Sequence, residues 1–170
     1  MSAETFTTAM FLITAVIAAG VLINAVFPVV YTMAGTFQSA THESDQRLRT
    51  DFKIVTTVAR ESTSDVHVWM KNIGSQRIPL ADIQKSDVFC GGVGNFGRLS
   101  YTDPPPALLL TGHWTAIFTD GDLNSNGFWD PGETLEVYAM PSVMFSNGDM
   151  MYFQYVLPDG IWRSNEFTAS

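Results

Sequence analysis

Residues 122–133, DLNSNGFWDPGE, carry oxygen-bearing groups at the spacing of an EF-hand-type calcium loop. In such loops, side chains at alternating positions surround a hard cation, a glycine at the sixth position allows a sharp bend, and a final glutamate binds with both oxygens. Gly127 stands at the sixth position and Glu133 at the twelfth. The sequence therefore predicts a calcium site whose ligands are Asp122, Asn124, Asn126, the main-chain carbonyl of Phe128, Asp130 and Glu133.

The segments that flank this loop indicate what kind of calcium site it forms. Residues 113–118 before it and residues 134–140 after it have the pattern of strands, whereas a calcium sensor needs a pair of helices. We therefore expect a structural ion that holds a hairpin loop. The alternative is an ordinary polar turn, because Asp, Asn and Gly also favour turns. Two Asn in place of Asp lower the ligand charge, which predicts a weak site that fills only where calcium is abundant, outside a cell.

No other group of residues predicts catalysis. His42, His67 and His113 share no metal-ligand spacing, and the sequence contains no G-x-S-x-G or H-E-x-x-H motif. The glycine-rich residues 90–97, CGGVGNFG, lack the Lys-Ser/Thr of a phosphate-binding loop, so we interpret them as a flexible connection in a sheet. The chain is therefore not expected to be an enzyme.

Cys90 is the only cysteine of the chain. An intramolecular disulfide and the usual thiolate zinc sites are therefore excluded. We expect Cys90 to be a small buried apolar residue, and the alternatives are an intermolecular bridge or a reactive thiol. The four tryptophans are interpreted as core or interface residues rather than as a ligand cage.

The elements that must position the calcium loop lie in the C-terminal two-thirds of the chain, where short alternating segments are separated by Pro and Gly. Strands are predicted within residues 52–61, 65–74, 107–120, 134–140 and 150–158. In the second of these, Val66, Val68 and Met70 share one face, and His67, Trp69 and Lys71 share the other. Because no helical period separates the strands, we expect an antiparallel, immunoglobulin-like β-sandwich over residues 51–170.

A long apolar segment precedes this domain. Residues 5–42 contain no Asp, Glu, Lys or Arg, and residues 9–33 are long and apolar enough to cross a bilayer as one helix. The polar residues 34–50 are expected to extend that helix, which makes the fold α+β. A buried core helix is a less favoured alternative because such helices are shorter, and a cleaved secretory signal is less favoured because the only early charge is Glu4.

Small and helix-breaking residues mark particular places on the apolar segment. Ala18, Ala19, Gly20 and Ala25 would let a neighbouring helix approach closely. Pro28 is expected to loosen or kink the helix near its far end.

Charge is unevenly distributed over a chain whose net charge is −8. Residues 1–98 balance eight acids with eight Lys and Arg, whereas residues 99–170 hold nine acids and only Arg163. An acidic surface repels phosphates, so no nucleic acid partner is expected. Arg47, Arg49 and Lys53 would place the domain in the cytoplasm by the positive-inside rule. They are distant from the apolar segment and accompanied by acids, so we give more weight to the calcium loop, which places the domain outside the cell.

Four stretches of the sequence resemble an accessory family of the archaeal flagellum (archaellum), the FlaG family. They are FLITAVIAAGVLINAVFPVVYTMAGTF at residues 11–37, RLRTDFKIV at 47–55, HVWMKNIGSQRI at 67–78 and DVF at 87–89. The resemblance implies an immunoglobulin-like domain outside the cytoplasmic membrane and assembly through N-terminal helices. It also implies a FlaF-type partner that contacts the surface layer, a stationary role around the rotating archaellum, and no catalytic residues.

Archaellins and type IV pilins resemble this chain in the same apolar segment, but they carry a basic leader that is cleaved. The chain begins MSAETFTTAMF without Lys or Arg, so we do not expect leader processing, and we favour an accessory protein over a main filament subunit. The function predicted first is a structural, membrane-rooted archaellum component that oligomerises through its N-terminal helix. The alternatives are a membrane-anchored, calcium-dependent binding module of the cell surface, an archaellin-like filament subunit, and a membrane-tethered enzyme.

Overall fold

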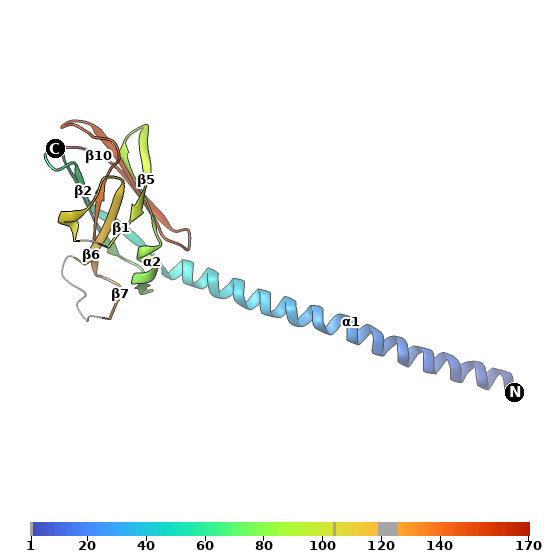
Figure 1. Ribbon diagram of the computed structural model, residues 1–170. Helices are drawn as coiled ribbons and strands as arrows, with labels where there is room; N and C mark the ends of the chain where they lie inside the picture. Colours follow the sequence, from blue (N-terminus) through green and yellow to red (C-terminus); the bar gives the residue numbers. More distant parts are fainter. Residues whose placement is uncertain (1, 104, 119–125) are drawn as a thin grey trace. The chain divides into compact units, whose positions relative to one another are not determined.

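The computed structural model describes residues 2–103, 105–118 and 126–170. The chain forms two compact units, Met1–Asp45 and Gln46–Ser170. The first unit is part of a single helix, and the second is a β-sheet domain that begins with the last turn of that helix (Figure 1).

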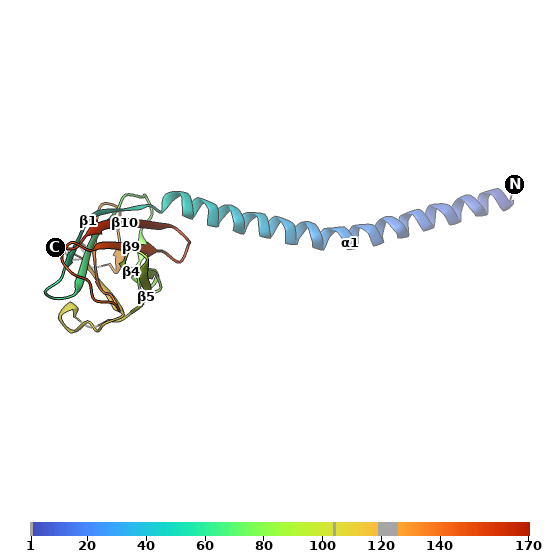
Figure 2. The same cartoon turned by 90° about the horizontal axis from the view of Figure 1, so that it is seen from above.

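Helix α1, Ser2–Arg49, runs for 48 residues without interruption. By length and composition it could cross a membrane, and its apolar side chains are exposed along its length. Six threonines (Thr7, Thr8, Thr14, Thr32, Thr36 and Thr41) donate their hydroxyls to the carbonyl four residues earlier, which satisfies polar groups inside the helix. Pro28 lies within the helix, which curves along its length (Figure 2). The predicted apolar helix and its polar extension are confirmed.

The β-sheet domain contains ten strands and two short helical segments among its described residues. The strands are β1 Phe52–Arg60, β2 Asp65–Asn72, β3 Ile78–Pro79, β4 Asp87–Gly92, β5 Asn95–Tyr101, β6 His113–Phe118, β7 Phe128–Trp129, β8 Thr134–Met140, β9 Met150–Val156 and β10 Trp162–Thr168. The helical segments are α2, Leu80–Gln84, and a 3₁₀ turn at Pro106–Leu108.

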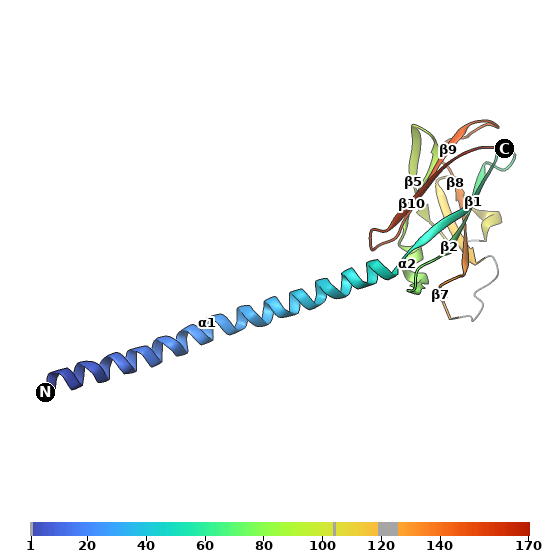
Figure 3. The same cartoon turned by 180° about the vertical axis from the view of Figure 1, so that it is seen from behind.

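Eight strands form one sheet in the order β1-β2-β8-β6-β5-β4-β9-β10, and the short β3 and β7 pair separately. All neighbours are antiparallel except β5 and β6, which pair in parallel at Ser100 with His113 and at Tyr101 with Trp114. The first and last strands lie side by side (Figure 3). The Ser170 N–H donates to the Ala59 carbonyl, so the sheet nearly closes on itself. The predicted antiparallel sandwich is confirmed, with one parallel pair joining its two halves.

The core lies between the two halves of this sheet. Val66, Val68 and Met70 point into it as the alternation of β2 predicts, and all three are fully buried. On the opposite face of β2, Lys71 is exposed, whereas His67 is only 8% exposed because the rings of Trp69 and Tyr138 pack against it. Of the four tryptophans, Trp114 and Trp129 are core residues.

The glycine-rich residues 90–97 form the hairpin of β4 and β5, so they connect two strands of the sheet as predicted, and most of them belong to the strands themselves. Backbone pairing runs through the glycines, with Cys90 opposite Gly97 and Gly91 opposite Phe96. Gly91 is required by close packing, because a Cβ there would lie 2.7 Å from the Asn95 carbonyl oxygen. Cys90 is buried as predicted, and burial raises the pKa of its thiol to about 12.

Candidate functional site: the helix anchor and the adjoining turn

The C-terminal end of α1 is bound to the β-sheet domain by main-chain hydrogen bonds. The Arg49 carbonyl accepts bonds from the N–H groups of Ser75 (2.9 Å) and Gln76 (3.1 Å). The Asp51 carbonyl accepts bonds from Ile73 (3.0 Å) and Gly74 (2.9 Å). The last carbonyls of a helix have no partner within the helix, and here the loop after β2 supplies partners. We call residues 49–51 and 72–76 the helix anchor.

Asn72 is the buried centre of the helix anchor and is 1% exposed. Its Nδ2 donates to the carbonyls of Gln76 and Trp129, at 2.9 Å each, and its Oδ1 accepts from the Gly74 N–H at 3.0 Å. Its main chain bonds to the Glu133 carbonyl (3.1 Å) and to the Gly132 N–H (2.8 Å). One residue therefore joins the loop that holds the helix end to the turn at residues 129–133.

That turn contains the described part of the predicted calcium loop. Asp122 and Asn124 lie outside the described residues. Asn126 Oδ1 accepts a bond from the Phe128 N–H at 2.9 Å, and its Nδ2 donates to Asp130 Oδ2 at 2.8 Å. Glu133 is 7% exposed, and its Oε2 accepts from the Asp130 N–H at 2.9 Å. Four of the six predicted ligands are thus close together.

The backbone of this turn has the shape that a calcium loop requires at its sixth position, since Gly127 has φ 74°. Within residues 126–133 the carboxylates of Asp130 and Glu133 both contribute to local hydrogen bonds. Across the described part of the chain, no three Asp, Glu, His or Cys side chains are grouped so that they could hold a metal ion. Calcium binding therefore stays a prediction that depends on the whole loop.

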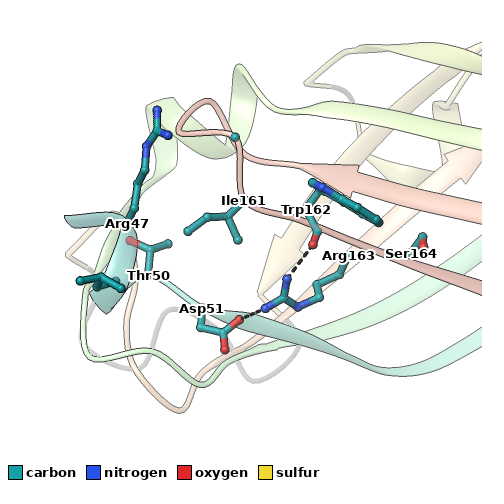
Figure 4. A pocket seen from close by; sticks show the side chains of 9 residues that line it. Arg47, Thr50, Asp51, Ile161, Trp162, Arg163 and Ser164 are labelled. Carbon is teal, nitrogen blue, oxygen red and sulfur yellow. Dashed lines mark hydrogen bonds and ion pairs between the residues drawn. The ribbon is translucent and has the colours of Figure 1, made fainter. Parts of the chain in front are cut away.

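A groove of about 690 Å³ opens beside the helix anchor (Figure 4). One wall is the end of α1 with the connection after it (Arg47, Leu48, Thr50 and Asp51), and the other is the start of β10 with the turn before it, residues 160–164. Leu48 is 85% exposed and Trp162 is 53% exposed, so both leave apolar surface at the groove in contact with solvent. The groove therefore lies between the end of α1 and the β9–β10 hairpin, and part of its apolar surface is open to solvent.

Arg163 holds a fixed positive charge on one wall of the groove. Its guanidinium pairs with the Asp51 carboxylate, donates to the Trp162 carbonyl at 2.7 Å, and lies 5.8 Å from the centre of the Phe52 ring. Figure 4 shows the two polar contacts as dashed lines. These contacts fix the side chain in place between the helix exit and β10.

A separate polar cluster lies on the outer face of β2 and β8. His67 Nδ1 lies 2.9 Å from Glu136 Oε1, and its Nε2 lies 3.0 Å from Asp65 Oδ2. Arg60 completes an ion pair with Asp65 at 3.0 Å. Burial is the largest cause that raises the pKa of Tyr138, and its hydrogen bond to Glu136 is the next; this pKa is about 12. The sequence did not group these residues, because they come from β1, β2 and β8.

This cluster predicts a loss of stability in acid. Burial raises the pKa of Asp65, but hydrogen bonds from Thr63, His67 and Arg60 outweigh it, so the pKa of Asp65 lies below its ordinary value of 3.8. A carboxyl with a lowered folded-state pKa stabilises the fold above its unfolded pKa, and this stability is lost as the pH falls below about 4. We expect Asp65→Asn to cost about 1 kcal/mol at pH 7 and nothing at pH 2. Urea unfolding at both pH values measures this, and equal costs would contradict it.

A sequence comparison decides the family. The profile of archaeal-type flagellins matches residues 3–167 of this chain. The chain belongs to the archaeal-type flagellin family. This membership confirms the resemblance to archaellum proteins seen in residues 11–89. Because the family consists of structural proteins, it also confirms the expectation that the chain is not an enzyme.

The chain is similar to a curated protein over nearly its whole length and to solved structures over two thirds of its length or more. An uncharacterised protein of Archaeoglobus fulgidus is 27% identical over 172 residues, which is 98% of each chain. The archaellum periplasmic stator protein FlaG of Sulfolobus acidocaldarius is 22% identical with a TM-score of 0.52, over 69% of this chain and 99% of that one. In the complex of FlaF and FlaG from the same organism, the match is 21% identical with a TM-score of 0.52, over 68% and 87% of the two chains.

The archaeal flagellum of Methanospirillum hungatei contains a chain of similar fold, with a TM-score of 0.64 and 13% identity over 97% of this chain and 93% of that one. At these identities the solved structures show a shared fold. The shared fold includes both the long helix and the β-sheet domain, since the match extends over nearly the whole chain.

Proposed function

We propose that the protein is a non-catalytic structural component of the archaellum machinery that oligomerises through α1, with its β-sheet domain outside the cytoplasmic membrane. The observation that carries this proposal is the continuity of α1 with the domain. Only Thr50 and Asp51 separate the helix from β1, and both ends of this connection are held by the helix anchor. The chain therefore passes from α1 into β1 through a short connection whose main chain is hydrogen-bonded to the domain.

The exposed apolar side chains of α1 supply the reason to assemble. Residues 9–33 span about 37 Å as a helix, more than the hydrocarbon thickness of about 30 Å. This surface must be covered by lipid, by other copies of the helix, or by both. Gly20 has no heavy atom within 4 Å of where its Cβ would lie, so a neighbouring helix could approach closely there.

The proposed partners are further copies of this chain and a FlaF-type protein, through which the assembly would reach the surface layer. The related stator complex from Sulfolobus acidocaldarius, in which FlaG is joined by FlaF, supports the second partner. The excess of acidic residues within residues 99–170 supports the absence of a nucleic acid partner. The likeness to the Methanospirillum flagellum, over 97% of the chain, favours a filament subunit as the second candidate function.

Electron microscopy of the gently extracted full-length protein tests assembly through α1. We expect rings or filaments from the full-length chain and single particles from residues 46–170, which form a compact unit. Gly20→Leu is expected to reduce the assembled fraction about tenfold while it leaves membrane insertion unchanged, because leucine fits the isolated helix but separates packed helices. Monodisperse particles from every variant would favour a membrane-anchored binding module instead.

We also propose that residues 122–133 bind a structural calcium ion, with Asp122, Asn124, Asn126, the Phe128 carbonyl, Asp130 and Glu133 as ligands. The left-handed backbone at Gly127 and the proximity of Asn126, Asp130 and Glu133 support this. A membrane-anchored, calcium-dependent binding module of the cell surface would use the same ion.

Thermal unfolding with and without calcium tests the ion. At a calcium concentration ten times the Kd, binding stabilises the fold by about 1.4 kcal/mol, which corresponds to about 5 °C in Tm. We expect Glu133→Gln to remove this gain and to have a much smaller effect in chelator. A drop in Tm of the same size in calcium and in chelator would show that Glu133 stabilises the turn through contacts within the protein, such as its bond to the Asp130 N–H, and not through an ion.

A further inference from the structure

One edge of strand β5 is open to solvent. β5 pairs with β4 over Asn95–Leu99, but among the described residues it pairs with β6 only at Ser100 and Tyr101. The β4–β5 hairpin therefore extends past β6 (Figure 1). We propose that this open edge pairs in antiparallel register with β5 of a second copy. The inference rests on the assembly through α1 proposed above, which concentrates copies, and it adds a contact between their β-sheet domains.

The main-chain groups along this edge lack partners. The Ser100 N–H donates to the Gly112 carbonyl at 2.9 Å, on the side of β6. Every second residue of a strand directs its N–H and C=O to the same side, so Phe96 and Arg98 direct theirs to the open edge. No other segment of the described chain bonds to them there, and residues 95–98 are all exposed. Such unpaired N–H and C=O groups can bond a further strand.

One register lets two copies bond symmetrically. When Gly97 of both copies lies at a two-fold axis, Phe96 of each copy is opposite Arg98 of the other. The two residues of such a pair exchange both N–H···O=C bonds, so every unpaired group of Phe96 and Arg98 finds a partner. Nothing lies within 4 Å of the Cβ position of Gly97, which leaves room for the second strand to approach.

The side chains of Phe96 and Arg98 suit this register. Phe96 is 47% exposed, and its ring centre lies 4.5 Å from that of Tyr152. Arg98 of the other copy would lie beside the Phe96 ring, and the guanidinium and the stem of an arginine both pack favourably on an aromatic ring. Arg98 Nε donates to Asp87 at 2.8 Å, so its charge is balanced within its own copy. Two copies therefore do not repel each other through Arg98.

The distribution of acids also favours this edge. Residues 99–170 hold nine acids and one Arg, so two copies repel each other wherever their acids face. Residues 88–102, which include all of β5, contain no Asp or Glu. Asp149, which lines a pocket with Asn95, accepts a bond from the Ser146 N–H at 2.7 Å. Pairing through β5 thus brings two domains together along a segment without acids.

Disulfide trapping in the full-length chain tests this pairing. Gly97→Cys places two thiols at a non-hydrogen-bonded position, where Cα atoms of antiparallel strands lie about 4.5 Å apart, within the range of a disulfide. The matched control is Asn95→Cys, exposed on the same strand, whose two copies would lie about 14 Å apart along the strand in this register. Both variants carry Cys90→Ala, because Cys90 is opposite Gly97 in β4 and could capture the new thiol.

On mild oxidation in membranes, we expect about tenfold more disulfide-linked dimer from Gly97→Cys than from Asn95→Cys, because pairing holds the thiols at high effective concentration. Arg98→Pro, added to Gly97→Cys, should abolish this excess, since it removes an N–H of the open edge and no bond to β4. Arg98→Ala loses the same side chain but keeps the N–H, so it should retain most of the dimer.

The outcomes separate this pairing from assembly through α1. If rings or filaments form but Gly97→Cys and Asn95→Cys give equal product, the pairing of β5 is wrong and assembly through α1 stands. Equal losses from Arg98→Pro and Arg98→Ala would also overturn it, because the contact would then depend on the side chain. Excess dimer without rings or filaments would support the pairing and count against assembly through α1. If neither forms, both proposals fail.

Discussion

Gly74→Ala is expected to lower the free energy of unfolding of the β-sheet domain by about 3 kcal/mol and to loosen the end of α1. A Cβ at this position would lie 2.4 Å from the Arg49 carbonyl oxygen and 2.6 Å from the Asp51 nitrogen. Both are main-chain atoms of the helix anchor, so neither can move aside without breaking the bonds that hold the helix end. The side chain must push residues 49–51 away from the loop after β2.

Urea unfolding of residues 46–170 measures this cost, with Gly97→Ala as the matched control. Gly97 also lies in an exposed part of the domain, but nothing lies within 4 Å of its Cβ position. The control should change the stability by less than about 1 kcal/mol. Hydrogen exchange should show faster exchange at the Ser75 and Gln76 amides in Gly74→Ala only. Equal behaviour of the two variants would mean that the anchor tolerates the extra carbon.

Asn72→Ala is expected to cost about 3 kcal/mol, because it leaves two main-chain carbonyls without the donor that the Asn72 side chain supplies. These groups are the carbonyls of Gln76 and Trp129, whereas the Gly74 N–H keeps its bond to the Asp51 carbonyl. Urea unfolding measures the loss, and Asn95→Ala, at an exposed position in the β4–β5 hairpin, is the control. A cost below about 1 kcal/mol would show that water replaces the side chain and that Asn72 does not connect the two loops.

Asn72→Asp sharpens this test through its pH dependence. The new carboxylate would still accept the Gly74 bond, but it would face two carbonyl oxygens in a buried site. The ionised form is therefore disfavoured in the folded protein, and the pKa of the new carboxyl is raised above its unfolded value. The folded state then binds more protons, so stability falls as the pH rises from about 4 to 7. The free energy of unfolding of Asn72→Ala should not show this additional dependence on pH.

The parts of the fold that the sequence predicted are those where a residue's environment follows from its neighbours in the chain. Residues 5–42 predicted an apolar helix because they contain no charged side chain, and a helix satisfies its backbone N–H and C=O groups internally. The alternation of Val66, Val68 and Met70 predicted the buried face of β2 because successive side chains point to opposite sides of a strand.

The helix anchor was not predicted, because its contacts join residues that are distant in sequence. Asn72 bonds to Trp129, 57 residues later, and a single Asn after a strand is more often part of a simple turn. The pair of Asn72 and Gly74 marked the end of a strand, but only the position of Arg49 shows why glycine is needed. The burial of His67 was not predicted either, because one of the two aromatic rings that cover it, Tyr138, comes from β8.

Because the sheet nearly closes on itself, few of its strand edges are exposed when many copies of the domain lie close together. The edge of a sheet presents unpaired N–H and C=O groups that recruit strands from other molecules and lead to aggregation. Here β1 and β10, the two ends of the strand order, lie against each other, joined by Asn165 with Thr57 and by Ser170 with Ala59. Each domain thus covers the edges of these two strands, which would otherwise pair with its neighbours. Domains held at high local concentration by their helices could then meet at the open edge of β5 or through side chains and remain separately folded.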